Sequence, residues 1–204
     1  VLWKLEERHE AEVLSYLSDT YGLKGEAAGS LTPALMEIAS RMAEDNLKDA
    51  MQGLEYEVEG TYLEGLGEDA VRVSFRELLQ NSIFYALSVR CGLDPMEYLE
   101  EEDFAGITDF NSPAALAVLG NAAGRLTEPV LMGIGRTVKK ICLKEEQKAL
   151  ENRAGTSYNE FSALKRKNES GKGGIGDGAD IPLGGGLPDP GPDHRGEAGT
   201  HREI

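Results

Sequence analysis

The chain has 204 residues, and its 36 acidic and 21 basic side chains give a formal net charge of −15 at pH 7. This length allows one domain or two small ones, and the shortage of large apolar residues in the last third favours one domain followed by a tail. Residues 1–110, which we call the acidic front, hold 24 acids and 8 bases. That balance argues against phosphate binding by the front, because nucleic-acid affinity depends largely on lysine and arginine.

Cysteine usage points to a reducing compartment. The two cysteines, Cys91 and Cys142, form no C-x-x-C pair, and no signal peptide precedes them. We therefore expect a cytoplasmic protein. The chain begins at Val1, inside a stretch that already reads as a helix, so we also expect it to be a piece of a longer protein.

Two amphipathic helices are predicted at the start of the chain. The first spans residues 2–21 and ends at Gly22, because glycine readily adopts the left-handed conformation of a helix terminus. The second begins with Thr32 as N-cap and Pro33 in first position, and its apolar periodicity continues to Gly53. Its methionines are interpreted as core filling rather than as a partner groove.

The stretch 54–73 alternates apolar and polar residues around three glycines, which is a period-2 signal. It predicts one or two short strands, forming a small β-hairpin that leans on the helices because an isolated hairpin is marginally stable. The glutamates Glu55, Glu57 and Glu59 would form one solvated face. A metal site there would lack both a histidine and a calcium-loop pattern.

The core is expected to be organised around a helix from Ser74 to Cys91. Ser74 and Glu77 have the S-x-x-E spacing of a capping box, and Gly92 supplies the end. No charged residue lies between Glu77 and Arg90, so this helix must be covered on most sides. It is too short and too polar to span a membrane.

Two further helix starts are predicted, at Asp94–Pro95 and at Ser112–Pro113, where a capping residue precedes a proline. The uncharged, alanine- and glycine-rich stretch 113–124 predicts close packing against the central helix. Pro129 then predicts a restart or a kink, because a proline inside a helix removes a hydrogen bond and clashes with the preceding turn.

A row of bases marks the last predicted helix and is the candidate site. Its members fall at successive i+4 positions and form what we call the basic ridge: Arg136, Lys140, Lys144 and Lys148. The ridge would either bind nucleic-acid phosphates or pair with the acidic front of the same domain. It has no interleaved aromatic residues for stacking on bases.

Together these patterns predict a mainly α-helical, bundle-like domain in residues 1–153, with a possible short hairpin at 54–73. Residues 154–204 are predicted to be a disordered, glycine- and proline-rich linker or tail. The segment 171–204 holds 11 glycines and 4 prolines and offers too little apolar surface to fold.

No pattern typical of catalysis, cofactor binding or metal binding is recognisable. His9 and Glu10 begin an H-E-x-x-H-like string, but Val13 stands where the second zinc ligand belongs. Neither cysteine has a histidine or acid partner at a recognisable spacing, and no G-x-S-x-G occurs. We therefore expect neither an enzyme nor a metal, cofactor or small-molecule site.

Four strings carry a resemblance to a known group of proteins. They are Y-x-L-x-x-R-C-G-L-D at 85–94, E-D-F at 102–104, D-F-N-S-P at 109–113 and A-V-L-G at 117–120. Together they resemble a recurrent helical segment of large multidomain proteins from Firmicutes conjugative elements and plasmids. In that family the segment sits beside ArdC-type antirestriction, helicase and methylase modules. The resemblance implies a mobile-element setting and carries no catalytic residue to this chain.

These observations favour a noncatalytic accessory or interaction domain of a mobile-element protein linked to DNA processing or antirestriction. Its expected partners are other domains or proteins of the element and possibly DNA, but no membrane. One alternative is a nucleic-acid-binding module that uses the basic ridge. Another is an acidic antirestriction protein whose front imitates DNA.

Overall fold

The computed structural model of the protein describes residues 3–170, and side-chain surroundings are described for 3–153 and Arg166. Contacts within the chain divide it after Ala154, and the packing described below belongs to the unit that ends there. The predicted tail begins in a helix, because residues 154–170 continue the last helix; the rest of that tail, 171–204, lies outside the described residues.

Every regular element within residues 3–170 is a helix, so the mainly α-helical fold is confirmed and the predicted hairpin is wrong. With 3-10 helices labelled η, the elements in chain order are α1 (Glu7–Tyr21), η1 (Gly25–Ala28), α2 (Leu31–Asp45), α3 (Leu47–Ala50), η2 (Leu54–Tyr56), η3 (Tyr62–Gly65), α4 (Glu68–Cys91), η4 (Pro95–Glu97), η5 (Glu101–Asp109) and α5 (Pro113–Ser170).

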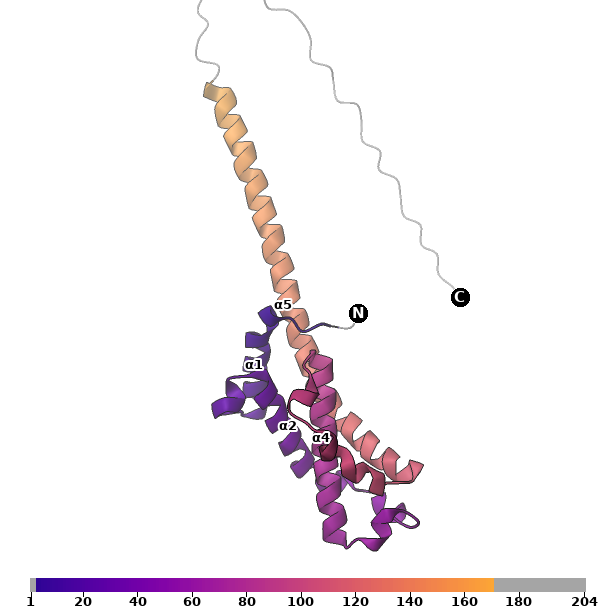
Figure 1. Cartoon of the computed structure of the whole chain (residues 1–204). Coiled ribbons are helices and arrows are strands. Elements are labelled where there is room, and N and C mark those ends of the chain that lie inside the picture. Colours follow the sequence, from indigo (N-terminus) through magenta and orange to yellow (C-terminus); the bar gives the residue numbers. More distant parts are fainter. Residues whose placement is uncertain (1–2, 171–204) are drawn as a thin grey trace, which may run out of the picture. The chain divides into compact units, whose positions relative to one another are not determined.

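The core is centred on α2, which lies between α1 and α4 (Figure 1). Leu35 and Ile38 of α2 are buried, as are Phe75 and Leu79 of α4. Removing each such side chain from water contributes about 1.5–3 kcal/mol, so this pair of helices supplies much of the stability. The short helix η1 packs against α1 and α2, and η5 packs against α4.

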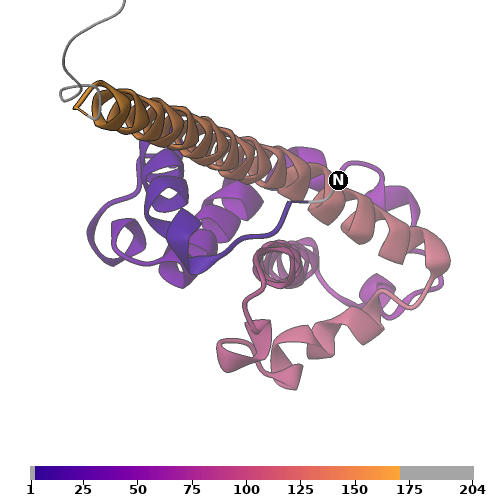
Figure 2. The same ribbon diagram turned by 90° about the horizontal axis from the view of Figure 1, so that it is seen from above.

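The part of α5 before Ala154 completes the core and runs past α1 (Figure 2). One row of its buried residues recurs every three or four positions: Ala115, Leu119, Ala122, Leu126, Val130, Ile134, Val138 and Ile141. Close approach occurs at Gly133 and Gly135, where the Tyr16 hydroxyl and the Trp3 ring occupy the space of a side chain. Glycine is thus required at two positions beyond the stretch 113–124 in which we expected it.

The second predicted helix is interrupted. Its N-cap is Ser30, so Thr32 lies inside α2 and is buried, and α2 ends at Asp45. Asn46 separates α2 from α3, and its side-chain amide donates to the carbonyl oxygen of Met42 at 2.9 Å. The asparagine amide competes with the backbone for a carbonyl acceptor, which ends the helix where periodicity alone would continue it.

The segment predicted as a hairpin folds instead into the single turns η2 and η3. Leu54 and Leu63 point into the core, while the Thr61 hydroxyl accepts a hydrogen bond from the Leu63 N–H at 3.2 Å. The Tyr62 N–H donates to the Asn111 side-chain oxygen at 2.9 Å, which ties η3 to the start of α5. Hydrogen bonds from backbone N–H groups to side-chain oxygens thus take the place of the backbone hydrogen bonds that paired strands would have made.

The central helix begins earlier than predicted. Gly67 is the N-cap of α4, so Ser74 lies inside the helix and forms no capping box. Val71 and Phe75 are buried one turn apart, whereas Val73 is 49% exposed, which is helical rather than alternating burial. The predicted end at Gly92 is confirmed, with φ +82° in the left-handed region.

Both predicted proline-containing helix starts are confirmed. The Asp94 carboxylate accepts from the Met96 N–H at 2.9 Å, and the Ser112 hydroxyl accepts from the Ala115 N–H at 3.0 Å. Of the two outcomes predicted at Pro129, a restart or a kink, the restart is wrong, because α5 continues through this residue. Two residues before Pro129, the buried Thr127 hydroxyl donates to the Ala123 carbonyl oxygen at 2.7 Å.

Candidate functional site

The basic ridge is solvent-exposed along α5. Arg136, Lys140, Lys144 and Lys148 are spaced by four residues, which places them on one helix face. The Lys144 ammonium lies 4.0 Å from a carboxylate oxygen of Glu12 in α1. Within the part of the chain that the structure describes, the other three bases have no ion pair. Most of the positive charge on the ridge therefore faces solvent.

Arg8 ties the start of α1 to α5 beside the ridge. Its Nε donates to Glu6 at 2.8 Å, and one of its terminal nitrogens donates to Glu145. The hydrogen bond from Arg8 lowers the pKa of Glu6, and the same bond raises the pKa of Arg8. Because Arg8 offsets the charge of Glu145, that acid does little to reduce the positive potential of the adjacent ridge.

The structure brings together two residues that the sequence keeps far apart. His9 is 1% exposed, and its Nε2 lies 3.7 Å from the Cys142 sulfur across the α1–α5 interface. The other ring nitrogen, Nδ1, accepts a hydrogen bond from the Glu6 N–H at 3.2 Å, so a neutral His9 carries its proton on Nε2. An imidazole protonated on the side facing the thiol cannot take the thiol proton. The pair therefore has structural geometry rather than that of a nucleophile and its base.

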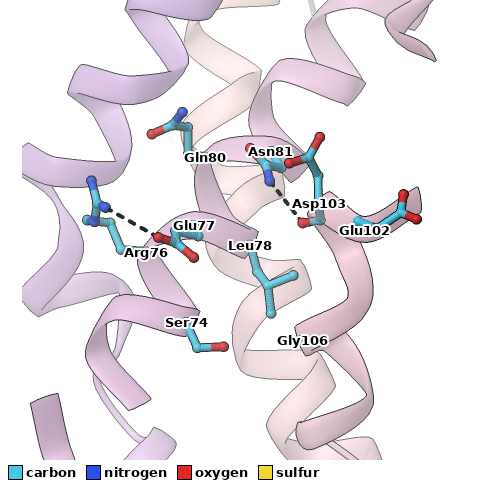
Figure 3. Close-up of a pocket in the computed structure, with 9 residues that line it drawn as sticks. All are labelled: Ser74, Arg76, Glu77, Leu78, Gln80, Asn81, Glu102, Asp103 and Gly106. Carbon is cyan, nitrogen blue, oxygen red and sulfur yellow. Dashed lines mark hydrogen bonds and ion pairs between the residues drawn. The ribbon is translucent and has the colours of Figure 1, made fainter. Parts of the chain in front are cut away.

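A polar hollow of about 440 Å³ lies between α4 and η5 (Figure 3). Asn81 bridges its walls by donating to the Asp103 carbonyl oxygen at 2.9 Å. Arg76 lies 3.8 Å from Glu77 on one side, and Glu102 lies on the opposite side of the hollow (Figure 3). The acids point in different directions, and no group of three metal-ligating side chains occurs anywhere within the described residues. The hollow has the polarity of a hydrated cleft.

An apolar groove of about 530 Å³ lies between α4 and α5. Its lining is dominated by small and apolar side chains, and the lining residues are Trp3, Ala86, Gly120, Ala123, Gly124, Thr127, Glu128, Leu131 and Met132. Glu128 is the one ionisable residue among them. The predicted site residues of the basic ridge all lie outside this groove, so the molecule carries two chemically different exposed surfaces.

Sequence reasoning missed this groove, although a signal for it was available. The absence of charge in 78–89 and in 113–124 predicts mutual packing of two helices. Packing of α4 and α5 uses one side of each uncharged stretch and leaves other uncharged positions exposed. A stretch that is uncharged on all faces predicts cover on all faces, and within the described residues the chain covers only part of it.

Comparison of the chain with protein-family models, with curated proteins and with solved structures found no match. Among the described residues, none of the helices combines the length and the apolar character that a membrane span requires.

Proposed function

We propose that the chain is a noncatalytic interaction domain of a mobile-element protein linked to DNA processing or antirestriction. It would act in the cytoplasm on other domains or proteins of the element. The observation that carries the proposal is the apolar groove left open between α4 and α5. Met132, which is 48% exposed, lines it together with Leu131 and with Ala86 of α4. Exposed apolar surface gathered in one place is typical of protein contact sites.

The mobile-element setting is supported by the resemblance that four strings in residues 85–120 carry. It can be tested in the element that encodes the protein. An in-frame deletion of residues 1–153 should lower transfer of the element to recipient cells. A loss confined to recipients with a restriction system would indicate antirestriction, and a loss in all recipients would indicate DNA processing. Supplying the intact chain from a second locus is the control. Unchanged transfer into both recipients would contradict the proposal.

A second candidate function is nucleic-acid binding by the basic ridge, and the three unpaired bases favour it. Each lost phosphate contact should reduce the slope of log affinity against log salt by about 0.7–0.9. The double variant Lys140→Ala with Lys148→Ala should therefore flatten that slope for DNA. The matched control, Lys24→Ala with Lys48→Ala, removes the same charge from exposed positions off the ridge. Equal slopes for the two double variants would exclude the ridge as a nucleic-acid site.

A further inference from the structure

We infer that α5 pairs with the α5 helix of a second copy of the chain, as an antiparallel coiled coil centred between Lys148 and Ala149. The contact surface lies on residues 143–153 of α5, which we call the projecting segment. This association goes beyond the two functions proposed above and depends on neither of them.

The projecting segment adds no side chain to the core. Among the residues of α5 whose surroundings are described, the last buried one is Ile141, and every residue from 143 to 153 is exposed. Most helical stability in proteins comes from packing of one helix face against other elements. The projecting segment would therefore gain stability from a partner helix.

An apolar seam runs along the projecting segment. Its members are spaced by four and three residues, as the core positions of a coiled coil are: Leu143, Gln147, Leu150 and Ala154. The two leucines are 50% and 64% exposed. A single polar residue in such a seam, here Gln147, lowers the stability of a coiled coil but fixes its register.

The chain's own α1 leaves this seam open. On the α5 side, α1 is contacted by Glu145, which accepts a hydrogen bond from Arg8. Glu145 lies two residues from both Leu143 and Gln147, which is about 200° around a helix of 3.6 residues per turn. The seam therefore faces away from α1, on the side from which a second helix can approach.

The charges beside the seam favour an antiparallel second copy. Positions next to the core seam form the ion pairs that set partner choice and orientation in coiled coils. One flank of the seam carries Lys144 and Glu151, and the other carries Glu146 and Arg153. In an antiparallel pair each flank faces the same flank of the other copy. Lys144 then faces Glu151 of the other copy and Glu146 faces its Arg153, so all four flanking contacts are attractive.

The alternative arrangements of two copies oppose like charges. In a parallel pair each flank faces the opposite flank, so Glu146 would face Glu151 of the other copy and Lys139 would face its Lys144. Moving the antiparallel pair by one heptad would place Glu146 opposite Glu146, or Arg153 opposite Arg153. The charge pattern therefore specifies both one orientation and one register.

The flanking charges are available for pairing. Within the described residues neither Glu146 nor Arg153 has an ion pair, and neither has an opposite charge three or four residues away on its own helix. The side chain of Lys144 keeps 58% exposure beside Glu12. Residues 139–153 hold 5 bases and 3 acids, so this part of α5 lacks the negative excess of the whole chain. Physiological salt screens more distant charges beyond about 8 Å.

The sequence continues the same register past the projecting segment. Ser157 and Phe161 keep the spacing of the seam, and Glu160 falls at the position that faces Lys139 of the other copy. The helix α5 continues to Ser170. The pairing is thus not limited to the four seam positions named above.

Charge exchange tests the orientation. Sedimentation velocity of the full chain at about 5–500 μM should show a monomer–dimer equilibrium. Glu146→Arg opposes two bases on each side of the dimer and should weaken it about tenfold, or about 1.4 kcal/mol. Adding Arg153→Glu to the same chain exchanges the two charges and should restore association. Glu55→Arg makes the same charge change at an exposed position of η2 and should leave association unchanged.

Seam variants test the contact surface. Leu150→Gln should weaken the dimer at least tenfold, and Gln147→Leu should strengthen it at least tenfold, about 1.4 kcal/mol in each case. Leucine and glutamine are both good helix formers, so α5 itself should persist. Ala149→Leu adds an exposed leucine away from the seam and should change nothing. Circular dichroism checks the helix content of every variant.

Three results would overturn the inference. A monomer at every concentration, with Gln147→Leu also monomeric, would exclude the dimer. Association that Leu150→Gln leaves unchanged would place the contact elsewhere on the chain. Stronger association of Glu146→Arg would indicate a parallel pair, and failure of the exchanged pair to restore association would reject the ion pairs. These measurements contain neither DNA nor another protein, so their outcome is separate from that of the transfer and salt experiments.

Discussion

Arg90 holds Trp3 against α4 through two different contacts. Its guanidinium carbon lies 3.8 Å from the centre of the Trp3 ring, and one of its terminal nitrogens donates to the Trp3 carbonyl oxygen at 2.8 Å. Trp3 in turn packs against Gly135 of α5. One arginine therefore joins the start of the chain to α4 and, through the indole, to α5.

Replacing Arg90 should release this anchor. A cation–π contact contributes about 0.5–1 kcal/mol and a hydrogen bond of a charged group about 1.5–3 kcal/mol. Allowing for exposure, Arg90→Ala should lower the free energy of unfolding by about 1–2 kcal/mol, and it should shift Trp3 emission to longer wavelength. Urea denaturation followed by fluorescence measures both effects. Arg72→Ala, an exposed position of α4, should change neither.

The register of α4 is tested by truncating two side chains that lie two residues apart, Val73 and Phe75. Phe75 is fully buried and packs on Phe110 with ring centres 6.0 Å apart, so Phe75→Ala should cost about 3–5 kcal/mol. Val73 is 49% exposed, and Val73→Ala should cost less than about 0.5 kcal/mol. Thermal denaturation compares the two. Similar losses of unfolding free energy would mean that Val73 and Phe75 face the same side, as they would in the strand that the sequence pattern suggested.

The two cysteines should differ in reactivity. Cys91 is 5% exposed, and burial raises the pKa of its thiol to about 11. Cys142 is only partly buried and borders His9. A disulfide-exchange reagent at pH 8 should therefore modify Cys142 in the folded protein and Cys91 only after denaturation. Mass spectrometry of the peptides identifies the modified residue, and rapid labelling of Cys91 would contradict its buried position.

The raised pKa of Cys91 also predicts a dependence of stability on alkaline pH. Below pH 9 the thiol is protonated in both the folded and the unfolded chain, so it adds no slope. Between pH 9 and about 11 the unfolded chain loses the proton while the folded chain keeps it. The free energy of unfolding should then fall by about 1.4 kcal/mol per pH unit from this group. Subtracting the profile of Cys91→Ala isolates its contribution, and parallel profiles would refute it.

Glycine substitutions should separate open positions from conformationally required ones. Gly124→Ala should raise the free energy of unfolding by roughly 0.5–1 kcal/mol. The added Cβ atom would meet nothing within 4 Å, and alanine is a better helix former than glycine. Gly92→Ala should lower it by about 1 kcal/mol or more, because the residue ends α4 at φ +82°. Chemical denaturation should therefore show that the two variants change the free energy of unfolding in opposite directions. A change in the same direction would contradict one of the two glycine assignments.

Local signals in the sequence predicted four helix ends correctly, whereas the caps predicted at Thr32 and Ser74 were wrong. Gly22 and Gly92 both end helices in the left-handed conformation, and Asp94 and Ser112 both cap helix starts. Each of these depends on two or three neighbouring residues, so sequence spacing contains the whole interaction. The same holds for the uncharged centre of α4, which is buried on most sides as predicted.

Failures arose where tertiary contacts outweighed local preference. Valines and alternation up to residue 73 suggested a strand, but burial of Val71 with Phe75 against the core favours a helix. The contact of His9 with Cys142 joins residues 133 positions apart, and no spacing rule reaches that far. The groove was missed although both uncharged stretches point to it, because an uncharged sequence predicts burial without saying whether the same chain provides the cover.

The hydrogen bond between the Tyr62 amide and Asn111 couples two segments that lie 49 residues apart. Tyr62 is the first residue of η3, and Asn111 belongs to the loop that leads into α5. Solvent hydrogen exchange at the Tyr62 amide therefore reports on opening of that loop as well as on its own turn. A change that loosens the start of α5 should therefore accelerate hydrogen exchange in η3. Exchange at the Tyr62 amide thus reports how well ordered α5 is, and α5 carries both the basic ridge and the apolar groove.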